Sequence, residues 1–531
     1  MRIKTFLGCC LFCWVGSLQA QNFGSGVDKI NQVLSFIQNM YLDTVDVSKL
    51  TDRVIMRTVA ELDPHSAFIP AKEVQAVNEE LEGSFEGIGV EFSIIMDTLV
   101  VVAPVAGGPS EAVGIFAADR IVAVNETSIA GIGLTNQGVY SHLRGPKGTK
   151  VSLTVVRKGV SEPLRFVVTR DKIPMNSIDA AYEALPDIAY LRINRFAFTT
   201  MTEFIDAISS KFTRKPKGVI LDLRGNPGGL MLTALQIAEQ FMERGNLLVF
   251  TEGMHIERQE EFASGMGFFI KTPVVVLIDE GSASASEILA GALQDWDRGI
   301  LIGRRSFGKG LVQHALSLVD GSQLRLTVAR YHTPTGRVIQ TPYTKGDKEG
   351  YYQQLLDRYA RGELFSKDSI RFLDSLSYRT LVNKRTVYGG GGIMPDIFIP
   401  QDTTGYTPYW ARIIRGGMVT EFMNTYIDQE RSLLSAQYKE FDAFKKHYQL
   451  PDSVVENLLN FAEQKGVSRD EEALAISLPL IRTQIKALIA RTLFDSSAYV
   501  QLINEWNDPA YNMALEVITN WSRYEKEVLG K

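Results

Sequence analysis

Short apolar runs alternate with helical patterns between residues 171 and 400, and this alternation limits the fold more than any other feature of the chain. Runs such as GVILDLRG and PVVVLIDE are typical of strands buried on both faces of a sheet. Between such runs, segments such as SEILAGALQDW place apolar residues at every third or fourth position, as helices do. The alternation favours an α/β layer with a largely parallel sheet. The runs GLVQHALSL and SQLRLTVARYH flank Asp320 and Gly321, so a hairpin is expected there.

The rest of the chain divides into segments of different character. Residues 84–170 hold short β-type runs separated by glycine-rich turns, which predicts a β-rich module of about 85 residues. The C-terminal part is helical by period, and Ser453 with Glu456 and Ser468 with Glu471 fit capping boxes. We therefore predict a multidomain α/β protein with five parts: a signal peptide (1–20), an N-terminal helical segment (21–83), the β-rich module (84–170), an α/β core (171–400) and a C-terminal helical domain (401–531).

The first twenty residues predict secretion. A basic start, MRIK, precedes an apolar run too short to cross a bilayer, and the small residues SLQA follow it. All three cysteines (Cys9, Cys10 and Cys13) lie in this segment, so the mature chain would have neither disulfides nor thiol catalysis. The net charge of -5 is small for 531 residues and argues against a dedicated nucleic-acid binder.

The stretch GSASASEILAGALQDW, residues 281–296, places three serines where a buried strand turns into a helix. Backbone N–H groups at a helix start have no partner within the helix and can hold a developing oxyanion, so a serine there suits acyl transfer. Serines are also good helix caps, and a cap is the alternative interpretation. One cap accounts for one serine but not for three.

A nucleophilic serine needs a base. His255, His314 and His332 are the histidines available within the core, and none lies in a glycine-rich loop. Lys309, by contrast, stands between two glycines in RRSFGKGLVQ. A solvated lysine has a pKa of about 10.4 and is a poor base, whereas burial lowers that pKa. A plain surface lysine remains the alternative.

Two glycine-rich turns could present backbone N–H groups to a substrate. In LDLRGNPGG, Gly228 and Gly229 follow a strand and precede a helix. Either their backbone N–H groups donate to a substrate carbonyl, or the two glycines only make a tight turn. In FEGIGVEF, a Gly-X-Gly turn leads into a β run, where it forms either a hairpin turn or a nest for a peptide C-terminal carboxylate. The residues of that nest are Gly87, Ile88, Gly89 and Val90.

Taken in order, LDPHSAFI, the GIGVEF-led β module ending in LRGPKGTKVSLTVVR, LDLRGNPGG, GSASASEILAGALQD, FGKGLVQ and GGGGIMPD closely resemble the motifs of the C-terminal processing peptidases, or tail-specific proteases. The resemblance covers roughly residues 30 to 400. It implies a serine protease with a Ser-Lys dyad, an embedded PDZ domain, and a core with crotonase- or ClpP-like layering.

The resemblance also assigns roles to residues. It implies Ser284 as the nucleophile, with Ser282 and Ser286 shaping or capping the turn, and it implies Lys309 as the base. Ala118 stands where the family usually has a glycine, so a differently shaped loop is expected there. The remaining roles implied are Gln313 positioning the lysine, Gly228 and Ala285 as oxyanion donors, and Asp295 as a supporting acid. The PDZ module, with Gly87 to Val90 as its peptide site, either only tethers the tail or also gates the active site. In the gating version, Arg144 in LRGPKG contacts both parts.

These features together predict a secreted, periplasmic serine endopeptidase that binds free, apolar protein tails through its PDZ domain and cuts near the C-terminus. No cofactor and no nucleic acid are implied, and no metal, since spacing such as H-E-x-x-H is absent. A homo-oligomer or an adaptor partner stays open. The alternatives are a catalytically silent PDZ scaffold, which the joint presence of Ser284, Lys309 and Gln313 disfavours, and an acyl-CoA enzyme of crotonase type, which would have to bind CoA.

Overall fold

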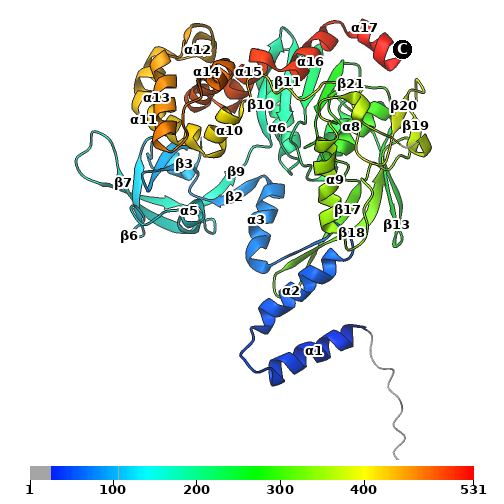
Figure 1. The fold of residues 1–531 in the computed structure, drawn as a ribbon, viewed down its shortest axis with the longest axis horizontal. Coiled ribbons are helices and arrows are strands. Elements are labelled where there is room, and N and C mark those ends of the chain that lie inside the picture. The colour runs from blue at the N-terminus through cyan, green and yellow to red at the C-terminus, as the bar shows by residue number, and fades with distance from the viewer. Residues whose placement is uncertain (1–25, 106, 373) are drawn as a thin grey trace, which may run out of the picture.

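A six-stranded sheet forms the centre of the computed structural model, which describes residues 26–105, 107–372 and 374–531 (Figure 1). All neighbouring strands run parallel except the first pair, β10 and β11, which is antiparallel. The largely parallel sheet predicted from the sequence is therefore confirmed. Its order is β10 (Ile178–Leu185), β11 (Ile188–Ile193), β12 (Gly218–Asp222), β15 (Val274–Ile278), β16 (Ile300–Gly303) and β21 (Ile397–Phe398).

Both faces of this sheet are covered, which explains why its strands read as unbroken apolar runs. In β12, Val219 and Leu221 point into one buried cluster and Ile220 points into another. Successive side chains of a strand leave on opposite faces, so a strand covered on both sides must be apolar throughout. The first face is covered by α7 (Met231–Glu239) and α8 (Ala285–Asp295), and the second by α15 (Ser496–Asn507) and α16 (Pro509–Thr519).

A second sheet packs on the far side of α7 and α8. It contains the expected hairpin, in which β17 pairs with β18 across the Asp320–Gly321 turn. It also contains β1, which comes from the stretch LDPHSAFIP. The strands are β1 (Ala67–Ile69), β13 (Leu247–Gly253), β14 (Ile256–Phe262), β17 (Leu311–Ser317) and β18 (Gln323–His332), and α6 (Thr200–Lys211) lies beside β10.

The β-rich unit, whose strands and helices run from β3 to β8, is a six-stranded sheet with its own buried cluster. A two-stranded ribbon of β2 (Ser84–Gly87) and β9 (Asp171–Pro174) joins it to the rest of the chain. Ala118 has a φ of 68°, the left-handed region that favours glycine. The loop thus keeps a left-handed residue although it lacks the glycine. The elements are β3 (Val90–Ile95), β4 (Thr98–Pro104), α4 (Pro109–Ala112), β5 (Arg120–Val124), β6 (Thr127–Ser128), α5 (Asn136–Leu143), β7 (Lys150–Val156) and β8 (Leu164–Thr169).

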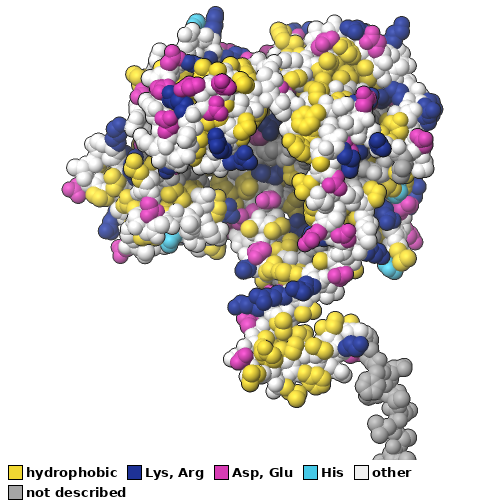
Figure 2. All heavy atoms as spheres, viewed as in Figure 1, with side chains coloured by type: hydrophobic (Ala, Val, Ile, Leu, Met, Phe, Trp, Pro, Cys, Tyr) yellow, Lys and Arg dark blue, Asp and Glu magenta, His cyan; other side chains and the backbone are white. Residues whose placement is uncertain are grey.

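The N-terminal helices α1 (Gly26–Met40) and α2 (Val47–Ala60) project from the body as an arm (Figure 1). Hydrophobic side chains gather on this arm, Phe36 and Met40 among them (Figure 2). The next helix, α3 (Ala71–Glu82), runs back to the junction between the β-rich unit and the core. The predicted signal peptide, residues 1–20, lies outside the described residues.

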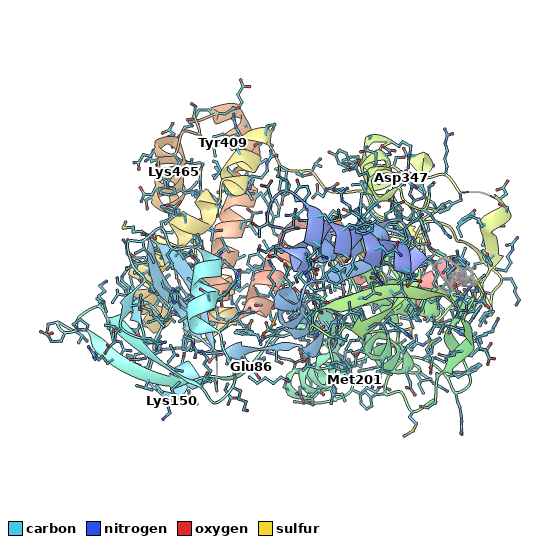
Figure 3. The ribbon with its side chains drawn as sticks, turned by 90° about the horizontal axis from the view of Figure 1, so that it is seen from below. Glu86, Lys150, Met201, Asp347, Tyr409 and Lys465 are labelled. Atoms are coloured by element: carbon cyan, nitrogen blue, oxygen red, sulfur yellow. The ribbon has the colours of Figure 1, made fainter. Side chains whose placement is uncertain are left out.

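A segment inserted before β21 carries α9 (Lys348–Ala360), two 3-10 turns (Lys367–Ser369 and Asp374–Leu376), and the hairpin of β19 (Ser377–Arg379) and β20 (Thr386–Tyr388). Seen from below, Asp347 at the start of α9 lies in the same half of the molecule as Met201 of α6 (Figure 3). The opposite half holds Lys150 of the β-rich unit and Tyr409 and Lys465 of the C-terminal helices (Figure 3).

The C-terminal helices pack around a buried hydrophobic cluster of their own, above the β-rich unit in Figure 1. By length and composition α14 could cross a membrane, yet it packs in this cluster through residues such as Ile481 and Ile485. The helices before α15 are α10 (Pro408–Arg415), α11 (Met418–Gln437), α12 (Phe441–His447), α13 (Asp452–Gln464) and α14 (Glu471–Leu493), and α17 (Trp521–Tyr524) with a π-turn (Glu525–Leu529) follows α16.

Candidate active site

Ser284 is the N-cap of α8 and has φ 55° and ψ −113°, a conformation rare for a residue with a side chain. Such backbone strain costs about 1–3 kcal/mol and persists only where the surroundings impose it. The two flanking serines impose it here. The Ser282 hydroxyl donates to the Leu223 carbonyl at 2.8 Å, and the Ser286 hydroxyl donates to the Asn226 carbonyl at 3.0 Å. Both are fully buried, so they shape the turn as expected, while Ser284 lines a cavity.

Lys309 lies in the loop between β16 and β17, largely removed from solvent. Burial lowers the pKa of its ammonium, and the positive charge of Arg325 lowers it further. The lysine Nζ donates to the Gln313 Oε1 at 3.1 Å, so the glutamine does position the lysine side chain.

Ser284, Lys309 and Gln313 line one cavity of about 380 Å³. Its apolar wall includes Met231, Ile288 and Leu311, and Asn78 and Leu81 of α3 close one side. Within the described part of the chain, no hydrogen bond joins the Lys309 Nζ to the Ser284 hydroxyl. The structure therefore brings the predicted pair to one cavity without placing the two groups in direct contact.

Glu287, which was not predicted as a site residue, connects the two halves of this arrangement. Its fully buried carboxylate accepts the N–H groups of Ser284 at 2.8 Å and Lys309 at 2.9 Å. It also accepts the Gly308 N–H at 2.8 Å and the Ser306 hydroxyl at 2.5 Å. Burial raises the pKa of this carboxyl to about 7. The S-x-x-E spacing from Ser284 to Glu287 is the signal that could have found it.

His65 was also missed, because it comes from a segment far away in the sequence. Its carbonyl accepts the Gln313 side-chain N–H at 2.5 Å, so it fixes the glutamine that holds Lys309. The turn is anchored by Asp63, which accepts the N–H groups of His65 and Ser66 and the Thr327 hydroxyl of β18. Burial and the nearby Lys309 charge lower the pKa of the His65 ring to about 4, so the ring is neutral near pH 7.

The two predicted oxyanion donors differ. The Ala285 N–H has no acceptor among the described residues, as an open donor requires. The Gly228 N–H, however, donates to the Asn226 Oδ1 at 2.8 Å, so it is occupied in this conformation. Gly228 still lies against the nucleophile turn, since a Cβ added to it would stand 2.8 Å from the Ser284 Cβ and 3.0 Å from the Ala285 N.

Asp295 lies at the opposite end of α8, about 16 Å from its start at 1.5 Å per residue. It forms a fully buried ion pair with Arg337 at 2.7 Å and accepts the N–H and hydroxyl of Thr335. Its support is therefore to the helix and not to the reacting groups.

The predicted peptide-binding and gating residues meet near the ribbon that joins the β-rich unit to the core. The Ile88 and Gly89 carbonyls accept backbone N–H groups of Ser110 and Val105, and β3 is an edge strand. The Arg144 guanidinium pairs with Glu79 of α3 at 2.6 Å and stacks on the rings of Phe85 and Tyr140. Arg144 thus links the β-rich unit to the helix that closes the Ser284 cavity.

Comparisons with known proteins decide the family. The model of peptidase family S41 matches residues 187–349. The carboxy-terminal-processing protease of Bartonella bacilliformis is 37% identical over 325 residues, which is 60% of this chain and 74% of that protein. The chain belongs to the carboxy-terminal processing proteases. The carboxy-terminal processing protease CtpA of Bacillus subtilis is 34% identical and covers 70% of this chain and 80% of that protein.

Two further matches concern a solved structure and the C-terminal helices. A solved structure of the photosystem II D1 C-terminal processing protease is 31% identical and covers 59% of this chain and 83% of that one, but its TM-score of 0.34 is too low to support a structural argument. Residues 409–495 match a family of unknown function (DUF8443). The C-terminal helices thus carry a recurring unit to which the match assigns no activity.

Proposed function

We propose that this protease cleaves peptide bonds with a Ser284–Lys309 dyad. The observation that carries the proposal is the joint placement, on one cavity, of a strained serine at a helix start and a partly buried lysine whose pKa is lowered. A neutral lysine can accept a proton, and the strained turn presents the serine hydroxyl.

In the reaction, the neutral Lys309 Nζ takes the Ser284 proton while the oxygen attacks the substrate carbonyl carbon. The oxyanion accepts a hydrogen bond from the Ala285 N–H. It accepts a second one from the Gly228 N–H once that group no longer donates to the Asn226 Oδ1. Breakdown expels the amine, which takes the proton from Lys309, and leaves an acyl-enzyme. Water then attacks, giving its proton to Lys309, and the acid product departs as Ser284 regains a proton.

We infer that the β-rich unit is a PDZ domain and that its Gly87–Val90 turn binds the substrate's C-terminal carboxylate. An apolar tail would add as a strand beside the edge strand β3. Tail binding would reach the cavity through Arg144, Glu79 and α3. Ser284 and Lys309, both within the described residues, are not hydrogen-bonded to each other, and the Gly228 N–H donates to Asn226. Both features agree with a resting state that the substrate must rearrange before cleavage.

The remaining sequence predictions belong to the same proposal. We infer a signal peptide at residues 1–20, export to the periplasm, division of the mature chain at residues 83, 170 and 400, and crotonase- or ClpP-like layering of the core. Homo-oligomers or adaptor partners are compatible with it. The family membership and the retained Ser284, Lys309 and Gln313 disfavour a silent scaffold or an acyl-CoA enzyme.

The test uses a protein substrate with an apolar, unstructured tail, read by mass spectrometry. Wild type should cleave it near the C-terminus, amidation of the tail should weaken cleavage, and Ser284→Ala and Lys309→Ala should abolish it. Cleavage that survives Ser284→Ala would refute the dyad. Tail binding without cleavage by wild type would favour the scaffold.

A further inference from the structure

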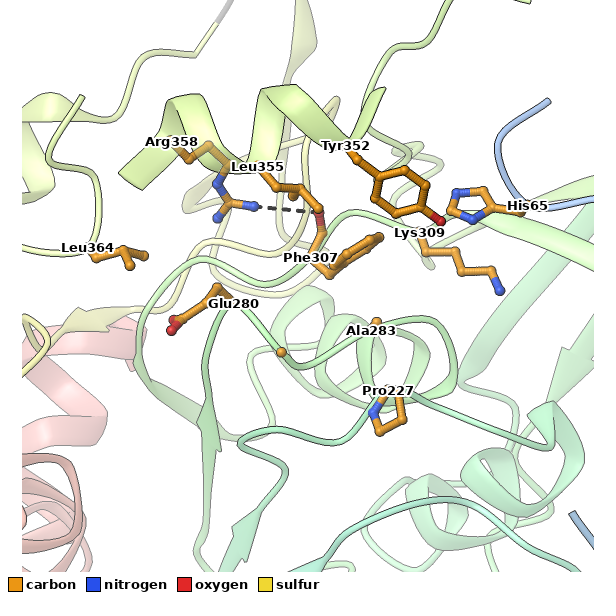
Figure 4. A pocket seen from close by; sticks show the side chains of 11 residues that line it. His65, Pro227, Glu280, Ala283, Phe307, Lys309, Tyr352, Leu355, Arg358 and Leu364 are labelled. Atoms are coloured by element: carbon orange, nitrogen blue, oxygen red, sulfur yellow. Dashed lines mark hydrogen bonds between the residues drawn. The ribbon is translucent and has the colours of Figure 1, made fainter. Parts of the chain in front are cut away.

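A second cavity, of about 540 Å³, shares lining residues with the Ser284 cavity. Figure 4 shows the side chains that line it. Lys309 and Pro227 line both cavities, whereas Ser284 lines only the first. The second cavity therefore begins at the base and extends away from the nucleophile.

The wall of this cavity is mainly apolar and comes from two segments. Phe307 precedes Lys309 in its loop, and Tyr352 and Leu355 project from α9 (Figure 4). Leu364, just after α9, is 9% exposed and closes the far end. Most of α9 lies beyond residue 349, where the match to the family model ends. The side of the wall that α9 supplies thus lies beyond the matched residues, whereas Phe307 lies within them.

The wall is held in place by buried contacts. Arg358 of α9 is 4% exposed and donates to the carbonyls of Ser306 and Arg305, each at 2.9 Å. The hydroxyl of Tyr351, also on α9, lies 3.1 Å from the His65 Nε2. Helix α9 is therefore fixed to both the Lys309 loop and the His65 turn, so the cavity is preformed.

Apart from Lys309, whose Nζ donates to the neutral Gln313 Oε1, the charged groups around the cavity are already paired. Glu280 accepts the Arg304 Nε at 2.7 Å, and the Arg358 guanidinium is directed to backbone carbonyls and to Glu363. The His65 ring is neutral near pH 7 because its pKa is lowered to about 4. A charged substrate side chain would lose its hydration here without gaining a free partner, whereas an apolar one would gain burial.

We propose that this cavity binds an apolar side chain, of leucine or phenylalanine size, from the residue directly after the scissile bond. The proposal rests on the dyad mechanism proposed above. In that mechanism Lys309 gives its proton to the departing amine, so the leaving segment lies on the lysine side of Ser284. The first cavity holds the acyl side, and the cavity under α9 receives the leaving side.

The test measures kcat/KM for tail-bearing peptides that differ only in the residue after the scissile bond: Ala, Leu, Phe or Asp. We expect wild type to prefer Leu or Phe over Ala by about tenfold or more, with Asp the poorest. Leu355→Trp fills the cavity and should reduce this preference severalfold. Its matched control is Leu356→Trp, on the next residue of α9, whose side chain is 64% exposed and should leave the preference at the wild-type ratio. If Leu355→Trp does not fold, Tyr352→Ala replaces it in the test. The Tyr352 side chain is 44% exposed, and its truncation should lower the preference for Phe.

Several results would overturn the assignment. One is an equal kcat/KM of wild type for all four peptides. Another is the same Leu-to-Ala and Phe-to-Ala kcat/KM ratios in Leu355→Trp and Leu356→Trp. The third is that Leu355→Trp changes the preference for the residue before the scissile bond instead of the residue after it. Ser284→Ala separates this failure from failure of the dyad. If that variant is inactive and the preference is absent, only the cavity assignment falls; if it still cleaves, the dyad falls as well.

Discussion

Among single residues, Lys309 decides whether the proposed dyad works, because only its neutral form can accept the Ser284 proton. Its pKa is lowered mainly by burial, then by Arg325, while the charges of Glu287 and Asp63 oppose the shift. A buried amine beside a cation is a better base at neutral pH than a solvated one. The rate should therefore rise with pH as Lys309 loses its proton.

Arg325→Gln tests this electrostatic account. The variant removes a positive charge that lowers the Lys309 pKa, so that pKa rises and the acidic limb of the kcat/KM profile moves to higher pH. Arg330→Gln, an exposed position on the same strand, is the control and should leave the profile in place. An unmoved limb in Arg325→Gln would show that Lys309 is not the titrating base.

Ala118→Gly should stabilise the β-rich unit. Ala118 occupies a left-handed φ that costs a residue with a Cβ about 1–2 kcal/mol, partly offset by the greater freedom of glycine in the unfolded chain. We expect a net gain of about 0.5–1 kcal/mol, seen as slower hydrogen exchange in β4 and β5. Ala117→Gly, where φ is not positive, should instead destabilise. Equal effects of the two variants would contradict the strain argument.

Sequence patterns predicted the residues that follow strands but missed those that depend on distant chain segments. Ser284 and Lys309 could be predicted as site residues because each lies in a short motif of its own. His65 was missed because its contact with Gln313 joins positions 248 residues apart. The expected capping boxes at Ser453 and Ser468 were wrong: the N-caps are Pro451 and Asp470, and Asp470 accepts the Ala473 N–H. The S-x-x-E pattern that mattered stands at Ser284.

Among the secondary-structure elements, buried strands were predictable and exposed ones were not. Strand β14 is polar and almost fully exposed, and it forms because it pairs with β13. Helix α8 shows the reverse case, because every one of its residues is buried. Its two ends serve different purposes: the start presents Ser284, and the end is fixed by the Asp295–Arg337 pair.

Asp295→Asn should therefore lower stability rather than catalysis. Removing one charge of a fully buried ion pair lowers the free energy of unfolding by about 3–5 kcal/mol, because the remaining charge of Arg337 is buried with neither its partner nor water to solvate it. We expect a large loss in denaturant resistance, with a near-normal rate for the folded fraction. Adding Arg337→Met should recover part of the stability. A rate loss without a stability loss would mean that Asp295 acts in the reaction after all.

In the whole molecule, the proposed tail site and the cavity are connected through α3. Arg144 pairs with Glu79 on that helix, and Asn78 and Leu81 of the same helix line the cavity. The C-terminal helices hold the other side of the β-rich unit, since Asp428 pairs with Arg120 at 3.0 Å and Arg491 pairs with Glu91 at 2.8 Å. The unit is thus held between two supports, and among the described residues it is α3, not the C-terminal helices, that lines the cavity.

Arg144→Met tests the coupling through α3. It removes the ion pair with Glu79 while keeping an apolar side chain, so kcat/KM for a free tail should approach that for an amidated tail. Glu79→Gln should act the same way. Arg165→Met, at an exposed position of the β-rich unit, should keep the wild-type ratio. If Arg144→Met also keeps that ratio, the β-rich unit only tethers the tail.

The central claim, that Lys309 activates Ser284, is tested most directly by covalent labelling with a fluorophosphonate, which reacts with an activated serine hydroxyl. After digestion, mass spectrometry should place the label on Ser284 alone. The labelling rate should rise with pH in wild type and fall to the background in Lys309→Met. A label on another residue, or an unchanged rate in Lys309→Met, would contradict the account.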